Sequence, residues 1–240
     1  MKKYLLSLWV LLVPVMMHAG TPKVSLEGSL MISSTYIWRG GAMCGFHFNP
    51  DVSLNIGNFC IDHSSYITPD GSYKEIDFDL SYTLGDFSIH IADYYWHSND
   101  DPEVENFFNW KKESTRHFDE VSLVYDSSAI PLKVSWFTFL WGDWIPDDNG
   151  DRGKMSFSSF LELEVWHEFG PYGRGAFILG TSILPGSYTD YSRSFMPVHI
   201  GLNYSKSFDL GFLSIPVGID LVFNPYSRQC LAAASLGLAF

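Results

Sequence analysis

Carboxylate side chains occur at every second position in several stretches of this chain. Glu75, Asp77 and Asp79 alternate with Ile76 and Phe78. A period of two is typical of a β-strand with one polar and one apolar face. The other acidic residues in stretches of this kind are Glu27, Asp51, Glu120, Glu162 and Glu164. Two interpretations follow: an acidic surface that attracts cations through its negative potential, or a filled interior in which these carboxylates pair with Lys and Arg.

One His-Ser pair has the spacing of a hydrolase site. His63 and Ser65 lie two positions apart, so a strand places them on one face, and this spacing resembles that of the nucleophile and base of outer-membrane phospholipase A. Nucleophilic catalysis also needs a third group that orients the base, and the sequence shows no clear Asn or Asp for that role. We therefore expect no enzyme. Of the functions considered for this chain, that of an outer-membrane hydrolase is the least favoured.

Composition excludes several classes of protein. The 240 residues include 15 basic and 27 acidic ones, which gives a net charge of −12. Phosphate contacts need a basic surface, so we expect no nucleic-acid partner. The three cysteines have no paired metal-ligand spacing, and the acidic loop at 147–151 lacks the distal Glu of a calcium loop. We therefore expect neither a metal nor a cofactor.

The first 19 residues have the order of parts found in a secretory signal peptide. A basic start at Lys2 and Lys3 precedes an apolar stretch, and the small residues Ala19 and Gly20 follow it. No apolar run of about 18 residues occurs later in the chain, as a membrane-spanning helix would need. We therefore divide the chain into a signal peptide, 1–19, and one exported domain, 20–240.

The alternation continues to the end of the chain and predicts twelve strands. Their ranges are 24–38, 45–56, 59–67, 74–84, 87–97, 116–126, 131–142, 154–168, 173–184, 194–206, 211–224 and 229–240. Short connections such as 57–58 take turns with longer polar ones such as 98–115 and 143–153. Long strands joined in this way are typical of outer-membrane proteins. The predicted fold class is all-β: a transmembrane, antiparallel, up-and-down β-barrel of about 12 strands.

A membrane barrel turns its apolar face to lipid, whereas a soluble β-sandwich or a lipocalin-like barrel turns it inward. Alternation fits both, but aromatic residues near the strand ends favour the membrane, because amphipathic rings form girdles at the two interfaces. The predicted girdle consists of Tyr36, Trp38, Tyr95, Trp96, Trp141, Trp166, Tyr204 and Phe240. A charge on the lipid side would cost about 2–4 kcal/mol near the midplane, so we expect the acidic residues named above to face the lumen.

Two cysteines fall at the same predicted end of the barrel. Cys44 lies in the first long connection, and Cys230 begins the last strand. The first and last strands become neighbours when a barrel closes, and an exported protein meets an oxidising compartment. We therefore predict a Cys44–Cys230 disulfide across the seam, with Cys60 unpaired near the other end.

Three short motifs resemble the TorF-like family of outer-membrane porins. The segment Ser34-Thr35-Tyr36-Ile37-Trp38-Arg39-Gly40 is similar to an early Ser-x-Tyr-x-aromatic-Arg-Gly segment of that family. The acidic strand 75–82 and the pair Tyr95-Trp96 resemble a later hairpin. The resemblance covers residues 30–97 and depends elsewhere mainly on the strand pattern. It implies a porin, and it brings no catalytic residues with it.

One expectation and one alternative of a different class follow. We expect an integral outer-membrane β-barrel, in contact with lipid and lipopolysaccharide, that acts as a passive diffusion channel for small, cationic solutes. Its alternating last strand, which ends at Phe240, is the segment that we expect the barrel-assembly machinery to recognise. The alternative is a non-conducting structural or adhesive barrel that acts through the connections 98–115 and 143–153. The sequence does not predict the oligomeric state.

Overall fold

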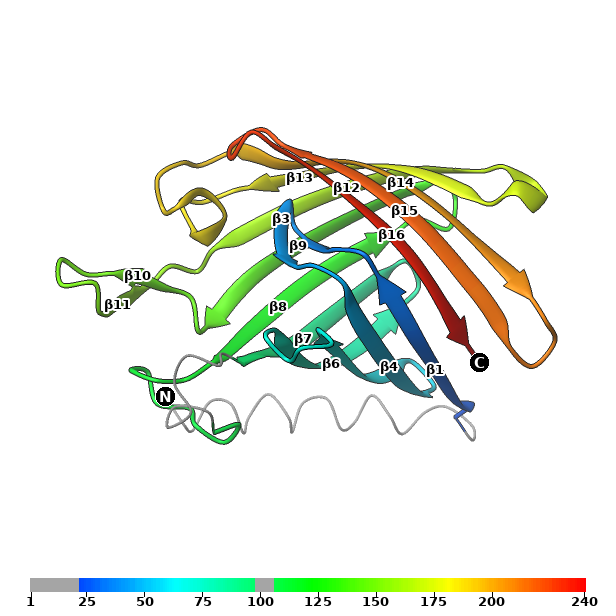
Figure 1. Ribbon diagram of the computed structural model, residues 1–240, viewed down its shortest axis with the longest axis horizontal. Helices are drawn as coiled ribbons and strands as arrows, with labels where there is room; N and C mark the ends of the chain where they lie inside the picture. Colours follow the sequence, from blue (N-terminus) through cyan, green and yellow to red (C-terminus); the bar gives the residue numbers. More distant parts are fainter. Residues whose placement is uncertain (1–21, 98–105) are drawn as a thin grey trace.

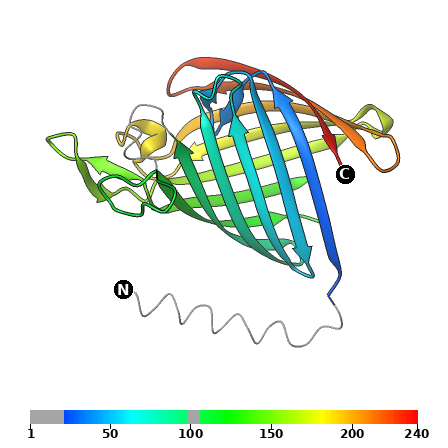
Figure 2. The same ribbon diagram turned by 60° about the horizontal axis from the view of Figure 1, so that its bottom comes forward.

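The computed structural model describes residues 22–97 and 106–240, and within them twelve antiparallel strands form a closed barrel (Figure 1, Figure 2). In their order around the barrel, the strands are β1 (Val24–Ser33), β16 (Gln229–Ala239), β15 (Ser214–Asn224), β14 (Met196–Asp209), β13 (Arg174–Ser182), β12 (Ser159–Glu168), β9 (Leu132–Trp141), β8 (His117–Asp126), β7 (Phe87–His97), β6 (Lys74–Leu84), β5 (Phe59–Ile67) and β4 (His47–Ile56). The predicted fold class is confirmed. The predicted signal peptide, 1–19, lies outside the described residues.

Pairing between the first and last strands closes the barrel. Leu30 of β1 pairs with Leu238 of β16 on one side and with Pro50 of β4 on the other. Directly paired residues share a face of the sheet, so the alternation carries from strand to strand around the wall, apart from register shifts beside Glu120 and Gly180. Large apolar side chains cover the outer face, as Leu26 (61% exposed) and Leu123 (58% exposed) illustrate. An apolar exterior of this kind is suited to lipid, and closure leaves no unpaired strand edge in it.

The two ends of the barrel differ in their connections. Residues 57–58, 85–86, 127–131, 169–173 and 210–213 connect strands at one end, which we call the short-turn end. Gly57 and Gly85 have φ angles of +61° and +60°, which suits tight hairpin turns with glycine at the first central position. The connections 34–46, 68–73, 142–158, 183–195 and 225–228 lie at the other end, the long-loop end, together with the described residues 106–116.

Small elements occupy some of these connections. A hairpin of β10 (Trp144–Pro146) and β11 (Arg152–Met155) projects away from the barrel (Figure 1). The described connections also hold the short 3₁₀ helices η2 (Gly170–Tyr172) and η3 (Ser187–Thr189). None of the helices in residues 22–97 and 106–240 has the length and apolar character needed to cross a membrane.

Two predicted strands are shorter than expected by five residues each. The strand predicted at 24–38 leaves the wall after Ser33, and β2 (Tyr36–Trp38) and β3 (Gly41–Cys44) form a separate hairpin. Ser34 marks the exit, because its N–H donates to the Ala234 carbonyl at 2.9 Å and its Oγ accepts from the Ala234 N–H at 3.0 Å. The strand predicted at 154–168 begins in the barrel only at Ser159, since Phe157 has a φ of +54° that interrupts the extended backbone.

Candidate functional site: a hairpin inside an acidic lumen

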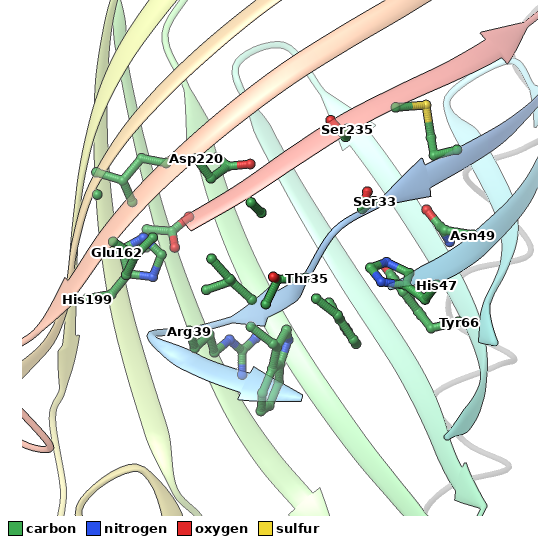
Figure 3. A pocket seen from close by; sticks show the side chains of 18 of the residues that line it. Ser33, Thr35, Arg39, His47, Asn49, Tyr66, Glu162, His199, Asp220 and Ser235 are labelled. Atoms are coloured by element: carbon green, nitrogen blue, oxygen red, sulfur yellow. The ribbon is translucent and has the colours of Figure 1, made fainter. Parts of the chain in front are cut away.

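The β2–β3 hairpin lies inside the barrel (Figure 3). Its tip consists of Arg39 and Gly40, whose φ angles are +47° and +84°. A Cβ atom on Gly40 would lie 1.9 Å from the carbonyl oxygen of Val198 on β14, so only glycine fits there. Asn224 of β15 donates from Nδ2 to the Gly40 carbonyl at 3.0 Å. The tip of the hairpin is therefore fixed against β14 and β15 by both shape and a hydrogen bond.

Arg39 links the hairpin to the opposite side of the barrel. Its two terminal nitrogens donate to the two carboxylate oxygens of Glu120 on β8, at 2.5 and 2.7 Å. The side chains of Arg39 and Glu120 are 7% and 2% exposed. Tyr94 donates to the same carboxylate at 3.0 Å, and Arg39 donates to the Tyr188 hydroxyl at 2.5 Å. Burial raises the pKa of that hydroxyl, which lies in the loop 183–195, so Tyr188 stays protonated.

Aromatic rings surround the Arg39 guanidinium on its remaining sides. Its Cζ lies 4.5 Å from the ring centroid of Trp38 and 4.1 Å from that of Phe137. The rings of Phe160 and Tyr188 follow at 5.2 and 5.7 Å. A cation over the face of an aromatic ring is stabilised by the ring quadrupole, more so when water is excluded. Bidentate pairing and ring contacts together anchor this arginine in the wall formed by β8, β9 and β12.

The base of the hairpin is held on the β5–β6 side. Tyr36 stacks on Tyr66 with ring centroids 4.0 Å apart and an interplanar angle of 4°. Its hydroxyl donates to Glu75 at 3.4 Å, and Tyr73 donates to the other oxygen of the same carboxylate. Glu75 is only 2% exposed. Its carboxylate therefore serves to dock the hairpin, although it belongs to the predicted acidic lining.

The hairpin lies between two cavities. One, of about 550 Å³, lies toward the short-turn end and is lined by strand residues such as Asn49, Glu162 and Asp220; we call it the lumen cavity. The other, of about 460 Å³, is lined by loop residues such as Asp143 and is called the loop cavity. Trp38 and Arg39 line both cavities. The hairpin is thus positioned as a partition across the path from one end of the barrel to the other.

The strand register places the predicted acidic residues on the inward face. Glu27 shares its face with Ser53 and Asp62, and Asp62 in turn pairs with Asp79. The same reasoning puts Asp51, Glu75, Asp77, Glu120, Glu162 and Glu164 on that face. Three of these carboxylates have a cationic or imidazole partner: Glu120 pairs with Arg39, Glu164 with Arg174, and Asp79 with His90 at 3.0 Å.

The predicted set lacks some of the acids on the inward face. Asp62 and Asp220 face inward, and Asp220 accepts a hydrogen bond from Asn203 at 2.7 Å. The signal for both was the alternation itself, since Asp62 shares its parity with Ser64 and Asp220 with Gly218. The sequence also predicted no role for the Arg39 side chain in the lumen, because nothing near it in sequence shows that the segment after Ser34 turns inward.

The predicted aromatic girdle is wrong for half of its members. Tyr36 and Trp38 belong to the inward hairpin and line the lumen cavity. Trp96 pairs with Glu75 and lines the loop cavity, and Trp166 pairs with Ala176 on the inward face beneath Arg174. The register places the remaining members, Tyr95, Trp141, Tyr204 and Phe240, on the outer face.

The predicted Cys44–Cys230 disulfide is also wrong, because the two residues lie on different sides of the wall. Cys44 pairs with Tyr36 in the hairpin inside the barrel. Cys230 pairs with Phe223 on the outer face and is exposed. The three cysteines, including Cys60, are free thiols. The neighbouring positions of β1 and β16, on which the prediction depended, are observed, but the inward turn of the first connection removes Cys44 from the seam.

The His63–Ser65 pair lies on the outer face of β5. The Ser65 hydroxyl is 3.4 Å from His63 Nε2, and His63 Nδ1 is 2.9 Å from the backbone carbonyl of Asp77. The imidazole stacks on Phe78. The group that orients the ring is therefore a backbone carbonyl and not a side chain.

The described part of the predicted loop 98–115 also packs on the outer face. Phe107 contacts Tyr95 and His117 with ring centroids 5.1 and 5.0 Å away, and Trp110 stacks on His117 at 3.8 Å. His117 pairs with Asp93 at 2.8 Å. Residues 106–115 therefore cover the outside of β7 and β8 and do not narrow the lumen, and 98–105 lie outside the described residues.

Comparison with known proteins gives similarity of fold. No protein-family model matches the chain, and no curated protein matches its sequence. Among solved structures, the KdgM porin matches with a TM-score of 0.50 at 10% identity, covering 89% of this chain and 98% of its own. The NanC porin matches with a TM-score of 0.48 at 10% identity, covering 90% of this chain and 99% of its own. An outer-membrane channel from Pseudomonas putida F1 matches with a TM-score of 0.47 at 8% identity, covering 93% of this chain and 97% of its own. The similarity to the KdgM porin is one of fold.

Proposed function

We propose that this protein is an outer-membrane porin of the TorF-like family, through which small solutes diffuse passively and cations pass in preference to anions. The observation that carries the proposal is the charge of the inward face. Within the described residues, Asp51, Asp62, Glu162 and Asp220 face the lumen, and none of them forms an ion pair with a basic side chain. A wall of this kind lowers the energy of a cation in the lumen and raises that of an anion.

The proposed location in the outer membrane is supported by the apolar exterior and the unequal ends of the barrel. The short-turn end would face the periplasm and the long-loop end the cell exterior, as in other outer-membrane barrels. Export would use the signal peptide at 1–19, and the last strand up to Phe240 would be read by the assembly machinery. Lipid and lipopolysaccharide would contact the outer face. The proposal assigns no catalytic step to the chain.

The hairpin would be the constriction of this channel, and its replacement tests the proposal. Ser33 and His47 are directly paired, so residues 35–45 can be replaced by a short Asn-Gly turn without breaking the β1–β4 pairing. Single-channel conductance of refolded protein in a planar bilayer is the measurement. We expect small steps from the natural chain and larger steps from the replacement variant.

The same recordings test the charge selectivity. In a KCl gradient, we expect a reversal potential that reports cation preference, and a weaker preference in the Asp51→Asn/Asp62→Asn variant. Asp148→Asn, in the exposed loop between β10 and β11, is the matched control and should leave the preference unchanged. Anion preference, or silence from both the natural chain and the hairpin replacement when folded and inserted, would overturn the proposal.

Silence would favour the alternative of a non-conducting adhesive barrel. The observation in its favour is the β10–β11 hairpin, which projects from the long-loop end with an exposed tip at 147–151 (Figure 2). Loss of partner binding after deletion of that tip would then identify the function. For the least favoured alternative, a lipid hydrolase, the Ser65→Ala variant should lose hydrolysis of a phospholipid substrate.

A further inference from the structure

One wall of the lumen cavity carries three polar groups with few partners. Glu162, His199 and Asp220 come from β12, β14 and β15, and all three line the cavity (Figure 3). Glu162 pairs with Gly180, and Gly180 pairs with His199, so a glycine without a side chain separates the carboxylate from the imidazole along one row of the sheet. A cavity of about 550 Å³ is within the size range of small-molecule sites.

The imidazole of His199 is buried without a hydrogen-bond partner. The residue is 9% exposed, and within the described part of the chain neither of its ring nitrogens has a partner. Two glycines make room for this ring. A Cβ on Gly201 would lie 2.5 Å from His199 Nε2, and one on Gly180 would lie 2.9 Å from His199 Cβ. A buried polar group without a partner is costly, so a ligand that bonds to it would remove that cost.

The carboxylates of the cavity are also not neutralised. Among residues 22–97 and 106–240, neither Glu162 nor Asp220 forms an ion pair with a basic side chain, although Asp220 accepts a hydrogen bond from Asn203. The basic residue of the lining is Arg39, and its terminal nitrogens are occupied by Glu120 and Tyr188. The cavity therefore has a negative charge that its own lining does not balance.

We propose that the lumen cavity binds a small organic cation that carries a primary ammonium group on an alkyl chain. An ammonium has three donors and no acceptor, which suits a carboxylate oxygen of Glu162 or of Asp220 and the acceptor nitrogen of a neutral His199. Apolar lining residues such as Ile37, Ile178 and Val222 would contact the methylene groups. This inference rests on the proposed function and narrows its cationic solutes to amines.

The test is calorimetric titration of the folded protein in detergent with 1,4-diaminobutane, and with 1,4-butanediol as the neutral probe of the same length. We expect the diamine to bind and the diol to give no heat of binding. The Glu162→Gln/Asp220→Asn variant should lose affinity about tenfold or more. The His199→Phe variant keeps an aromatic ring without a nitrogen and should also bind more weakly, whereas Asp148→Asn should bind like the natural chain.

Binding in detergent does not depend on conductance, so a non-conducting protein that binds the diamine would refute the channel and leave the site intact. Absence of binding to the natural chain would overturn the site, even if cation-selective conductance is observed. Equal affinity of the natural chain and the Glu162→Gln/Asp220→Asn variant would do the same. Binding of the diol with the same affinity as the diamine would also overturn the site, because the cavity would then select chain length and not charge.

Discussion

At the scale of single residues, Arg39 decides how firmly the hairpin is held. Arg39→Ala removes both bonds to Glu120, whose side chain is 2% exposed. Removal of one partner from a buried ion pair destabilises a protein by about 3–5 kcal/mol, because the remaining charge is left without compensation. We expect a loss of this size in the free energy of unfolding, measured by urea titration of the barrel in lipid vesicles.

Arg174→Ala is the matched control. It removes the pair with Glu164, but the arginine side chain there is 36% exposed, and such pairs contribute about 0–1 kcal/mol. Equal losses in the two variants would contradict a buried docking contact at Arg39.

The position of some residues follows from the sequence alone, and that of others does not. Trp166 shares its parity with Glu162 and Glu164, so the alternation that puts the carboxylates in the lumen puts this ring there too. For this residue, position in the strand and not residue type decides which face it occupies. Tyr36 is different, because its place depends on the chain leaving the wall at Ser34. That exit is stabilised by hydrogen bonds to Ala234, which is 200 residues away.

At the scale of elements, the conformation of the hairpin tip is the decisive feature. Gly40→Ala would place a Cβ 1.9 Å from the Val198 carbonyl, in a backbone conformation with φ of +84°. Gly85→Ala is the matched control, since its φ is +60° but no atom lies within 4 Å of the added Cβ. The left-handed conformation alone costs about 1–2 kcal/mol for a residue with a side chain. We expect a loss of that size in the unfolding free energy of Gly85→Ala and a larger one for Gly40→Ala, again by urea titration. A Gly40→Ala barrel as stable as the Gly85→Ala barrel would mean that the tip is not packed against β14.

Elements made by local pairing were predicted well. The strands at 59–67, 74–84 and 87–97 have the predicted bounds, because alternation and short glycine turns define them without help from the rest of the chain. The β2–β3 hairpin could not be predicted in this way. Its contacts to Glu120 and Tyr188 are 81 and 149 residues away in sequence, and no local pattern encodes such contacts.

At the scale of the whole molecule, alternation predicts the barrel but not what fills it. A strand has the same period of two whether its polar face meets water, an inserted hairpin or an ion pair. The twelve-stranded wall follows from that period and is observed in the described residues. The partition by Trp38 and Arg39 does not follow from it, because it depends on which connection turns inward.

The charge of the whole lumen leads to a prediction about salt. If unpaired carboxylates such as Asp51 and Asp62 produce the cation preference, mobile ions must weaken it, since the Debye length falls from about 10 Å at 0.1 M to about 3 Å at 1 M. We expect the potassium-to-chloride permeability ratio of the channel to fall toward one as KCl rises from about 0.1 M to about 1 M at a fixed gradient ratio. The measurement is the reversal potential in a planar bilayer.

A cation bound at one buried site would be screened far less, because salt weakens exposed charges most. A ratio that does not change with salt would therefore place the selectivity at a site in the lumen cavity, which Glu162, His199 and Asp220 line, and not along the wall as a whole.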